Sequence, residues 1–371
     1  MKKILVVFGT RPEAIKMAPL VKALLQSKEF ETKVCVTAQH REMLDQVLSF
    51  FKITPDYDLD LMKANQSLNE LSARILTAID PVLLDFQPDL VLVHGDTSTS
   101  SMVALAAFHK GIKVGHVEAG LRTYNKLAPF PEEINRQITG RIADIHFAPT
   151  QQSAQNLLDE KVEKENIYVT GNTVIDALFW GIQHVNEDRE DIKEIKQFVD
   201  TAKKVIVVTG HRRENFGDKF YEFCNALKQL ADRDDVQLIY PVHLNPNVQK
   251  AVYDTLGSHK NILLIAPLDY EAFIWLLNQS YLIITDSGGV QEEAPSLKKP
   301  VLVTRDVTER QEAVVSGVVK LVGTSKELII KEAVKLIENE AVYAKMISSD
   351  NPYGDGRTSI KIMEILKNIF F

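Results

Sequence analysis

The sequence predicts an α/β protein with two doubly wound domains that face each other across a cleft. Short apolar segments of strand length alternate with amphipathic helical segments along the whole chain, which is typical of parallel sheets covered on both faces. The chain has 371 residues, which is too long for one ordinary core. A second series of strands and helices begins after Gly171, so we expect two domains of similar construction.

The first series alternates strands with helices from the amino terminus onward. Its strands are expected at residues 3–8, 32–37, 90–94, 113–118 and 145–148. Its helices are expected at residues 17–27, 41–50, 68–86 and 98–110.

The second series has the same pattern. Its strands are expected at residues 205–209, 237–241, 262–265, 282–285 and 300–303. Its helices are expected at residues 220–233, 246–255, 270–279 and 289–296. The segment 168–172 and the charged run 186–196 are interpreted as the hinge region. Because a last helix at 359–371 could cross back, we expect an amino-terminal domain of residues 1–170 plus 357–371 and a carboxy-terminal domain of residues 171–356.

Composition excludes several classes of function. The chain is 45% hydrophobic and 25% charged, as in soluble globular proteins, and its net charge of -7 argues against a nucleic-acid partner. No apolar run reaches membrane-spanning length, and the amino terminus does not resemble a secretory signal. The only two cysteines, Cys35 and Cys224, are expected to be buried thiols in a reduced cytoplasmic protein.

The first motif is an apolar strand that runs into Gly9 and then into a helix. We expect free backbone N–H groups and the positive end of the helix dipole at this turn, where an anion can bind. Arg11 and Lys16 add cationic groups, and Pro12 suits the first position of a helix. No G-x-G-x-x-G follows the strand, so a nicotinamide cofactor is not predicted.

A similar turn follows the strand at 282–285. Ser287, Gly288 and Gly289 can surround phosphate oxygens, and Glu293 in the helix that follows can accept hydrogen bonds from ribose hydroxyls. Arg310, after the next strand, brings a guanidinium group to the same rim. These residue types favour a nucleoside diphosphate as the ligand. The structural alternative is a solvent-facing acidic helix with an ordinary serine cap, which would have the same residues.

Cationic side chains follow the first two strands of the second domain. His211 and Arg213 come after the strand at 205–209, and His243 comes after the strand at 237–241. Either histidine alone would more often be structural. Together with the arginines they can bind a diphosphate, and a protonated histidine can stabilise a departing phosphate.

Acids follow the strands of the first domain instead. Asp96 and Glu118 come after two of its strands, and Glu132 lies in a proline-rich loop shortly before Arg136. Carboxylates repel a diphosphate, so proton transfer explains them better than affinity does. Capping and loop ion pairs are the structural alternative. Metal ligation by Asp96, Glu118 and His116 is another, but the spacing of metal-binding motifs is absent, so neither a metal nor a cofactor is predicted.

Six ordered blocks between Lys3 and Arg357 resemble the bacterial, non-hydrolysing UDP-N-acetylglucosamine 2-epimerase family. The blocks are Gly9-Thr-Arg-Pro-Glu-Ala-Ile-Lys-Met-Ala-Pro19, His94-Gly-Asp-Thr97, His116-Val-Glu-Ala-Gly-Leu-Arg122, Pro131-Glu-Glu-Ile-Asn-Arg136, Gly210-His-Arg-Arg-Glu-Asn215 and Asp286-Ser-Gly-Gly-Val-Gln-Glu-Glu-Ala294. The resemblance implies two Rossmann-like domains in the glycosyltransferase-B arrangement, a homodimer, and interconversion of UDP-GlcNAc and UDP-ManNAc through elimination of UDP to 2-acetamidoglucal and its re-addition. The resemblance further implies that the protein supplies ManNAc for cell-surface polysaccharide.

The resemblance also implies roles for individual residues. Asp96, Glu118 and Glu132 would be acid/base groups at the sugar, and the residues that would hold UDP are Arg11, His211, Ser287, Glu293 and Arg310. The block that begins at Gln39, His40 and Arg41 resembles the segment that contacts a second, activating UDP-GlcNAc in bacterial members. Glu42, Arg213 and His243 would complete that allosteric site, whereas in the structural alternative Gln39 and His40 only cap a helix.

Three other functions are compatible with parts of this pattern. A glycosyltransferase of the same architecture would also need a nucleotide-sugar site, but it usually uses one catalytic base. A hydrolysing epimerase would release UDP and free ManNAc. A nucleotide-sugar sensor would leave the acids without a role.

Overall fold

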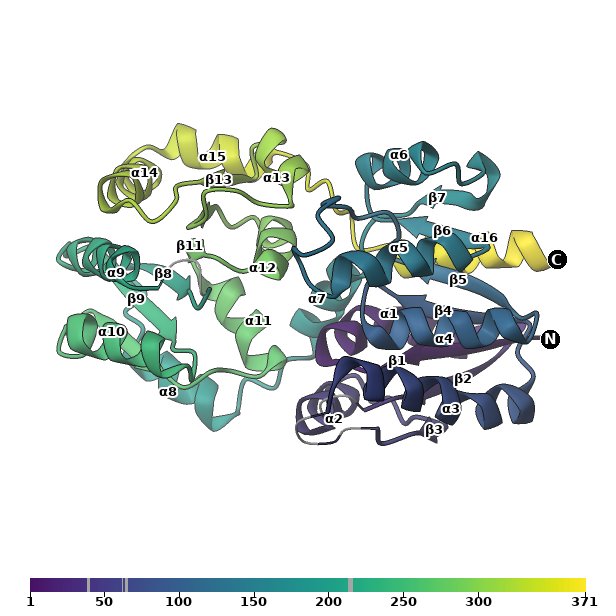
Figure 1. Cartoon of the computed structure of the whole chain (residues 1–371). Coiled ribbons are helices and arrows are strands. Elements are labelled where there is room, and N and C mark those ends of the chain that lie inside the picture. The colour runs from purple at the N-terminus through teal and green to yellow at the C-terminus, as the bar shows by residue number, and fades with distance from the viewer. Residues whose placement is uncertain (39–40, 62, 64–65, 213–215) are drawn as a thin grey trace. The chain divides into compact units, whose positions relative to one another are not determined.

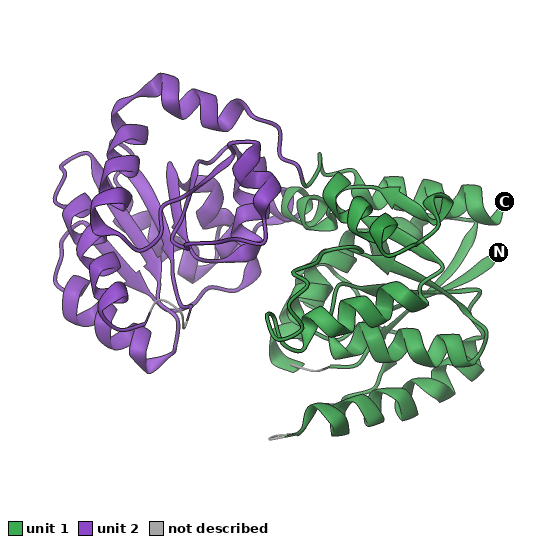
Figure 2. Cartoon of the chain, turned by 45° about the horizontal axis from the view of Figure 1, so that its top comes forward, with its two compact units in different colours: residues 1–180, 353–371 green, residues 181–352 purple. Residues whose placement is uncertain are grey.

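The structure is a computed structural model that describes residues 1–38, 41–61, 63, 66–212 and 216–371 (Figure 1). The chain forms two compact units (Figure 2). Unit 1 comprises Met1–Trp180 and Tyr353–Phe371, and unit 2 comprises Gly181–Pro352. Each unit is a parallel sheet with helices on both faces, as the alternation of apolar strands and amphipathic helices predicts.

Unit 1 contains a seven-stranded sheet in the order β3-β2-β1-β4-β5-β6-β7. The strands are β1 (Lys2–Phe8), β2 (Phe30–Val36), β3 (Tyr57–Asp58), β4 (Leu90–His94), β5 (Lys113–Val117), β6 (Ile145–Ala148) and β7 (Ile167–Val169). The helices are α1 (Arg11–Gln26), α2 (Arg41–Phe50), α3 (Leu68–Phe86), α4 (Ser98–His109), α5 (Glu132–Ile142), α6 (Gln151–Asp159), α7 (Thr173–His184), which runs on into unit 2, and α16 (Thr358–Phe370). Every residue of β4 is buried, which fits a strand covered on both faces.

Unit 2 contains a six-stranded sheet in the order β10-β9-β8-β11-β12-β13. The strands are β8 (Lys204–Thr209), β9 (Val236–Pro241), β10 (Ile262–Ile265), β11 (Leu282–Thr285), β12 (Val301–Val303) and β13 (Val319–Leu321). The helices are α8 (Glu190–Phe198), α9 (Asp218–Ala231), α10 (Pro246–Leu256), α11 (Tyr270–Gln279), α12 (Gly288–Glu293), α13 (Gln311–Val315), α14 (Lys326–Glu338) and α15 (Glu340–Ser348).

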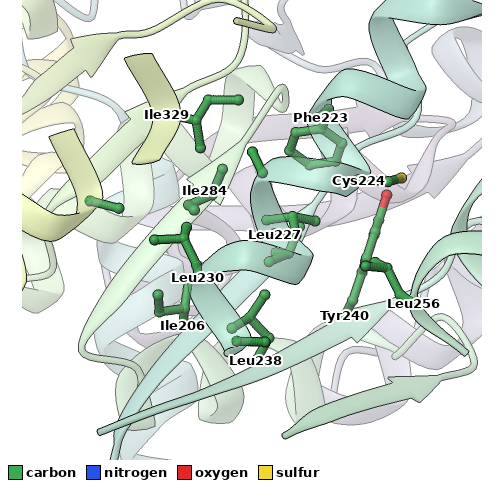
Figure 3. Packing of buried hydrophobic residues seen from close by; sticks show 14 of the residues in the cluster. Ile206, Phe223, Cys224, Leu227, Leu230, Leu238, Tyr240, Leu256, Ile284 and Ile329 are labelled. Atoms are coloured by element: carbon green, nitrogen blue, oxygen red, sulfur yellow. The ribbon is translucent and has the colours of Figure 1, made fainter. Parts of the chain in front are cut away.

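A large apolar cluster fixes the helices of unit 2 on one face of its sheet. Phe223 and Leu227 of α9 pack with Leu238 of β9, and Ile329 of α14 closes the cluster beside Ile284 of β11 (Figure 3). Cys224 lies in this cluster and Cys35 in the core of unit 1, so both thiols are buried and unbridged as expected.

The structure contains elements that the sequence did not reveal. The strands β3, β7 and β13 are two or three residues long, too short for a recognisable period. The segment after Pro131, expected as a loop, is the helix α5, and α1 begins at Arg11 rather than at residue 17. The charged run 186–196, interpreted as hinge, contains most of α8. Its Arg189 binds Asp269 and Glu271 within unit 2. Among the described residues, no helix is long and apolar enough to span a membrane.

The carboxy-terminal helix α16 belongs to unit 1. It packs on α1, and Phe370 contacts the ring of Phe30. Asp176 of α7 accepts hydrogen bonds from the backbone N–H groups of Thr358, at 3.1 Å, and Ser359, at 2.7 Å. These bonds satisfy the first turn of α16 and hold it to unit 1.

Strand order reverses at one place in each sheet. In unit 1, β2 and β5, which follow β1 and β4 in the sheet's connections, lie on opposite sides of the neighbouring pair β1 and β4. In unit 2, β9 and β12 lie on opposite sides of the neighbouring pair β8 and β11. Ligands of doubly wound folds bind beyond the carboxyl ends of the strands at such a reversal. The loops after β1, β4, β8 and β11 are therefore where a site is expected.

Candidate active site

The loop after β1 is closed by the side chain of Glu13, which is almost fully buried. Glu13 Oε2 accepts hydrogen bonds from the backbone N–H groups of Gly9, at 3.1 Å, and Thr10, at 2.8 Å. The hydroxyl of Thr10 caps α1 in return, which completes a capping box. The N–H groups that we expected to be free for an anion are thus occupied by the chain's own carboxylate, and that expectation was wrong for Gly9 and Thr10.

Glu13 also reaches the loop after β4. Its Oε1 accepts a hydrogen bond of 2.8 Å from the hydroxyl of Thr97, which directly follows Asp96. Burial raises the pKa of Glu13 to about 7, although the bonds from Thr97 and Thr10 oppose the shift. One carboxyl group therefore connects the two loops at the strand-order reversal of unit 1.

Glu118 follows β5 and is held in a strained backbone conformation, with φ of 63°. Its carboxylate forms an ion pair with Lys16 of α1 and accepts a hydrogen bond of 2.7 Å from Asn172 Nδ2. Burial, the largest single effect, raises the pKa of Glu118, but the charge of Lys16, together with smaller contributions from His94 and from the hydrogen bonds of Lys16 and Asn172, keeps the pKa below its usual range. Lys16, expected to bind substrate, is therefore shared with Glu118.

The loop that carries Asp96 passes beside Glu118, since a Cβ placed on Gly95 would be 3.4 Å from Glu118 Oε1. The carboxylate of Asp96 forms an ion pair with Arg136 of α5. Glu132 lies one turn before Arg136 on the same helix. It is half-buried and has no hydrogen-bond or ion-pair partner in the part of the chain that the structure describes. Unit 1 thus gathers the three predicted acids at the carboxyl edge of its sheet.

Glu133, next to Glu132, has a different task. It is fully buried and accepts hydrogen bonds from the backbone N–H groups of Thr123, at 3.1 Å, and Tyr124, at 3.0 Å. It therefore holds the loop before α5, while Glu132 remains available for chemistry.

His94 and His116 of unit 1 are buried, and burial favours their neutral forms. Burial lowers the pKa of His94 to about 4 and that of His116 to about 3. His116 Nε2 lies 2.7 Å from the carbonyl oxygen of Gly95, and this contact holds the loop that carries Asp96. Among the described residues, no group of three or more His, Cys, Asp or Glu side chains is placed to hold a metal ion. The prediction that no metal is needed remains a prediction.

Unit 2 has a buried carboxylate at its own reversal, Asp286 after β11. Its Oδ2 accepts hydrogen bonds of 2.8 Å from the backbone N–H groups of both His211 and Arg212, in the loop after β8. Asp286 is fully buried, and its Oδ1 lies 3.6 Å from His211 Nδ1. Asp286 thus fixes the backbone of His211, and its second oxygen lies near the His211 ring.

The ring of His211 stacks on that of His243, with centroids 4.8 Å apart and planes 8° from parallel. Burial lowers the pKa of His211, and the nearby Asp286 carboxylate works against this shift. Without a ligand, the neutral ring is favoured over the imidazolium that we expected. A bound diphosphate would favour the protonated form.

Ser287, Gly288 and Gly289 follow Asp286 directly, as predicted. The hydroxyl of Ser287 makes no capping bond to α12, although its N–H donates to Thr285 Oγ1 at 2.9 Å. A Cβ on Gly288 would lie 2.9 Å from Arg310 Cζ, so a larger residue there would push that guanidinium aside. Arg310 in turn forms an ion pair with Glu292, at 2.9 Å.

Glu293 lies at the end of α12, near the phenol of Tyr270 of α11. Burial together with the Glu293 charge raises the pKa of Tyr270 well above its usual value. The structure therefore brings His211, His243 and Arg310 to one edge of unit 2, together with the serine, the glycines and Glu293.

Sequence reasoning missed the residues that hold this machinery. The letters Thr10-x-x-Glu13 form a recognisable capping box, so Glu13 could have been found. Thr97, Asn172 and Asp286 act through contacts with distant segments, for which the sequence holds no local signal.

Three residues of the predicted allosteric site, Gln39, His40 and Arg213, lie outside the described residues. Glu42 is exposed in the first turn of α2, and Arg11 is partly buried at the start of α1.

Glu13 predicts a pH dependence of stability. Its raised pKa means that the folded protein binds a proton that the unfolded chain loses near pH 4.5. Relative to that of Glu13→Gln, the free energy of unfolding should fall by roughly 1–3 kcal/mol as pH rises from about 4.5 to about 7. Above pH 7 the difference should stay level. The neighbours that bond to Glu13 (Gly9, Thr10 and Thr97) do not titrate in this range. Urea unfolding of both proteins at pH 5, 6, 7 and 8 measures this difference, and equal pH profiles would contradict the assignment.

Comparison with known proteins gives a consistent result over the whole chain. Residues 22–367 match the family described as UDP-N-acetylglucosamine 2-epimerase. A UDP-N-acetylglucosamine 2-epimerase of Escherichia coli K12 is 56% identical over 370 residues, which cover 99% of this chain and 98% of that protein. The protein of that name from Campylobacter jejuni is 57% identical over 372 residues, covering 98% of this chain and 97% of its own.

Solved structures agree with this result and confirm the fold class predicted from the sequence. The UDP-GlcNAc 2-epimerase of Neisseria meningitidis, bound to UDP-GlcNAc, is 50% identical with a TM-score of 0.89, covering 99% of this chain and 100% of that chain. The enzyme of Methanocaldococcus jannaschii, in complex with UDP-GlcNAc and UDP, is 34% identical with a TM-score of 0.79, covering 99% of both chains. The chain therefore belongs to the UDP-N-acetylglucosamine 2-epimerase family.

Proposed function

We propose that this protein interconverts UDP-GlcNAc and UDP-ManNAc by inverting carbon 2 of the sugar. The observation that carries the proposal is that acids lie at the carboxyl edge of the sheet of unit 1, and that phosphate-binding residue types lie at the carboxyl edge of the sheet of unit 2. The relative from Neisseria meningitidis, 50% identical, is bound to UDP-GlcNAc, which supports the same ligand here.

The proposed reaction begins with an elimination. A carboxylate removes the proton from carbon 2 while the bond between carbon 1 and the UDP oxygen breaks, and the electron pair leaves with UDP. The product is 2-acetamidoglucal, with a double bond between carbons 1 and 2. Re-addition of UDP to carbon 1 and of a proton to the other face of carbon 2 gives the epimer. Electrons balance without a hydride acceptor.

The acids of unit 1 suit proton transfer near a diphosphate. Asp96 and Glu118 are each paired with a cation, Arg136 and Lys16 respectively, so that the site does not present two uncompensated negative charges. Glu132 has no such partner among the described residues and is half-exposed, which favours exchange of its proton with water. We propose these three carboxyl groups as the acid/base set.

The residues of unit 2 suit the leaving group. Gly288 allows the Arg310 guanidinium to approach the start of α12, where Ser287 offers a hydroxyl. His211, held by Asp286, can become protonated as negative charge develops on the departing diphosphate. We propose that Glu293 accepts the ribose hydroxyls and that Arg11 adds a further phosphate contact.

Proton NMR in deuterium oxide, with UDP-GlcNAc as the only substrate, tests the proposal. We expect UDP-ManNAc to form and deuterium to enter carbon 2 of both epimers, because the removed proton exchanges with solvent. Accumulation of UDP and free ManNAc would instead identify a hydrolysing epimerase. Binding without turnover would identify a sensor, and turnover that requires an added acceptor would identify a glycosyltransferase.

The acid/base assignment predicts large losses of turnover. Asp96→Asn, Glu118→Gln and Glu132→Gln should each lower kcat by at least ~10²-fold, the low end for general acid–base groups. UDP affinity should change little, because these residues act on the sugar. Glu163→Gln, an exposed change in the same unit, is the control. A variant that keeps wild-type kcat would remove its residue from the acid/base set.

The ribose contact predicts a loss of UDP affinity. Glu293→Gln keeps an acceptor for the Tyr270 hydroxyl but removes the charge, so UDP should bind roughly ten- to a hundred-fold more weakly. Calorimetry with UDP measures the change. Glu271→Gln, on the same helix as Tyr270 but bound to Arg189, is the control. Equal affinity in both variants and wild type would refute the contact.

We further propose that a second UDP-GlcNAc activates the enzyme through Gln39, His40, Glu42, Arg213 and His243. An activator favours the state that it binds more tightly. UDP-ManNAc alone should then react slowly until a trace of UDP-GlcNAc is added, and rates against UDP-GlcNAc should be sigmoidal. Hyperbolic rates with immediate conversion of pure UDP-ManNAc would argue against the second site.

Three further expectations remain proposals. They are assembly as a homodimer, a cytoplasmic location, and supply of ManNAc units to cell-surface polysaccharide.

A further inference from the structure

The hydroxyl of Thr97 makes two hydrogen bonds at once. It accepts the backbone N–H of Ser100 at 3.1 Å, which caps α4, and it donates to Glu13 Oε1 at 2.8 Å. The first bond stays within one helix end. The second joins the loop after β4 to the start of α1, 84 residues away in sequence. A helix cap needs only the first bond.

Glu13 can serve as a fixed point because its own surroundings are rigid. Its other oxygen is held by Gly9 and Thr10. Gly9 in turn is closely packed, since a Cβ there would lie 2.1 Å from Thr37 Oγ1 and 2.5 Å from Thr99 Oγ1. The hydrogen bond to Glu13 therefore fixes the position of Thr97 relative to the packed end of β1.

Asp96 is held from two directions as a result. Its carboxylate is bound by Arg136 of α5, and its backbone continues directly into Thr97. Proton transfer requires a carboxylate placed within a fraction of an ångström, and a misplacement of about 1 Å can cost roughly 10²-fold in rate. An ion pair with a long arginine side chain leaves freedom that the backbone anchor removes.

We propose that Glu13 is a positioning residue that acts through the Thr97 hydroxyl to place Asp96 for proton transfer. This inference rests on the proposed epimerase function. Glu13 and Thr97 touch neither sugar nor phosphate in it; their contribution passes through Asp96.

The first test removes the hydroxyl while keeping the shape of the side chain. Thr97→Val should lower kcat by roughly 10- to 100-fold, whereas KM and UDP affinity stay within about twofold, because only the placement of an acid changes. Thr97→Ser restores the hydroxyl and should recover most of kcat. The matched control is Thr150→Val, because Thr150 caps α6 of the same unit by accepting the N–H of Ser153 at 3.1 Å. A Thr97→Val enzyme as active as Thr150→Val would overturn the proposal.

The second test is a double-mutant cycle with Asp96. If Thr97 acts through Asp96, Thr97→Val should lower kcat little or not at all in the Asp96→Asn background. A full additional loss there would show that Thr97 acts independently of Asp96 and would contradict the proposal. Glu13→Ala should match Thr97→Val, and combining the two should cost no more than either alone. Thermal unfolding checks that each variant is folded. If Glu13→Ala does not fold, the double-mutant cycle between Thr97 and Asp96 still tests the positioning role.

The outcome separates this inference from the function on which it rests. Wild-type protein that does not epimerise UDP-GlcNAc refutes the proposed function. Active wild-type protein with an unaffected Thr97→Val variant refutes the positioning role alone.

Discussion

A buried carboxyl group at the reversal of strand order is the interaction on which the candidate residues of each unit depend. In unit 1, Glu13 joins the loop after β1 to Thr97 in the loop after β4. In unit 2, Asp286 joins the loop after β11 to the backbone of His211 in the loop after β8. In a doubly wound sheet the chain leaves these two neighbouring strands toward opposite sides, so the loops that follow them diverge. A carboxyl group that accepts several backbone and hydroxyl hydrogen bonds connects the loops, at the cost of being buried.

The two units carry different residue types at the carboxyl edges of their sheets. Unit 1 carries carboxylates and pairs two of them, Glu118 and Asp96, with Lys16 and Arg136. In the proposed reaction, the cationic forms of His211 and Arg310 in unit 2 would suit the developing charge on a diphosphate. Burial lowers the pKa of His211, so in the proposed reaction its protonation can accompany diphosphate binding or bond cleavage.

The sequence predicted the fold well where elements are long and periodic, as for α2 and α3, whose bounds were matched. It failed at α5, because two prolines before Glu132 suggested a loop, and at β3, which is too short to show a period. The acids after β4 and β5 were recognisable because parallel strands place their carboxyl ends at one edge. The partners of those acids were not recognisable from the sequence. Lys16 and Glu118 are 102 residues apart, and only the folded chain brings them together.

The central claim is that UDP leaves carbon 1 during epimerisation, and positional isotope exchange tests it most directly. UDP-GlcNAc is prepared with oxygen-18 in the bridge between carbon 1 and the β-phosphorus, and is recovered after partial conversion. If UDP departs and returns, rotation of its β-phosphate moves the label into non-bridging positions, and phosphorus NMR should detect this in the recovered UDP-GlcNAc. Formation of UDP-ManNAc with the label retained entirely in the bridge would contradict the account.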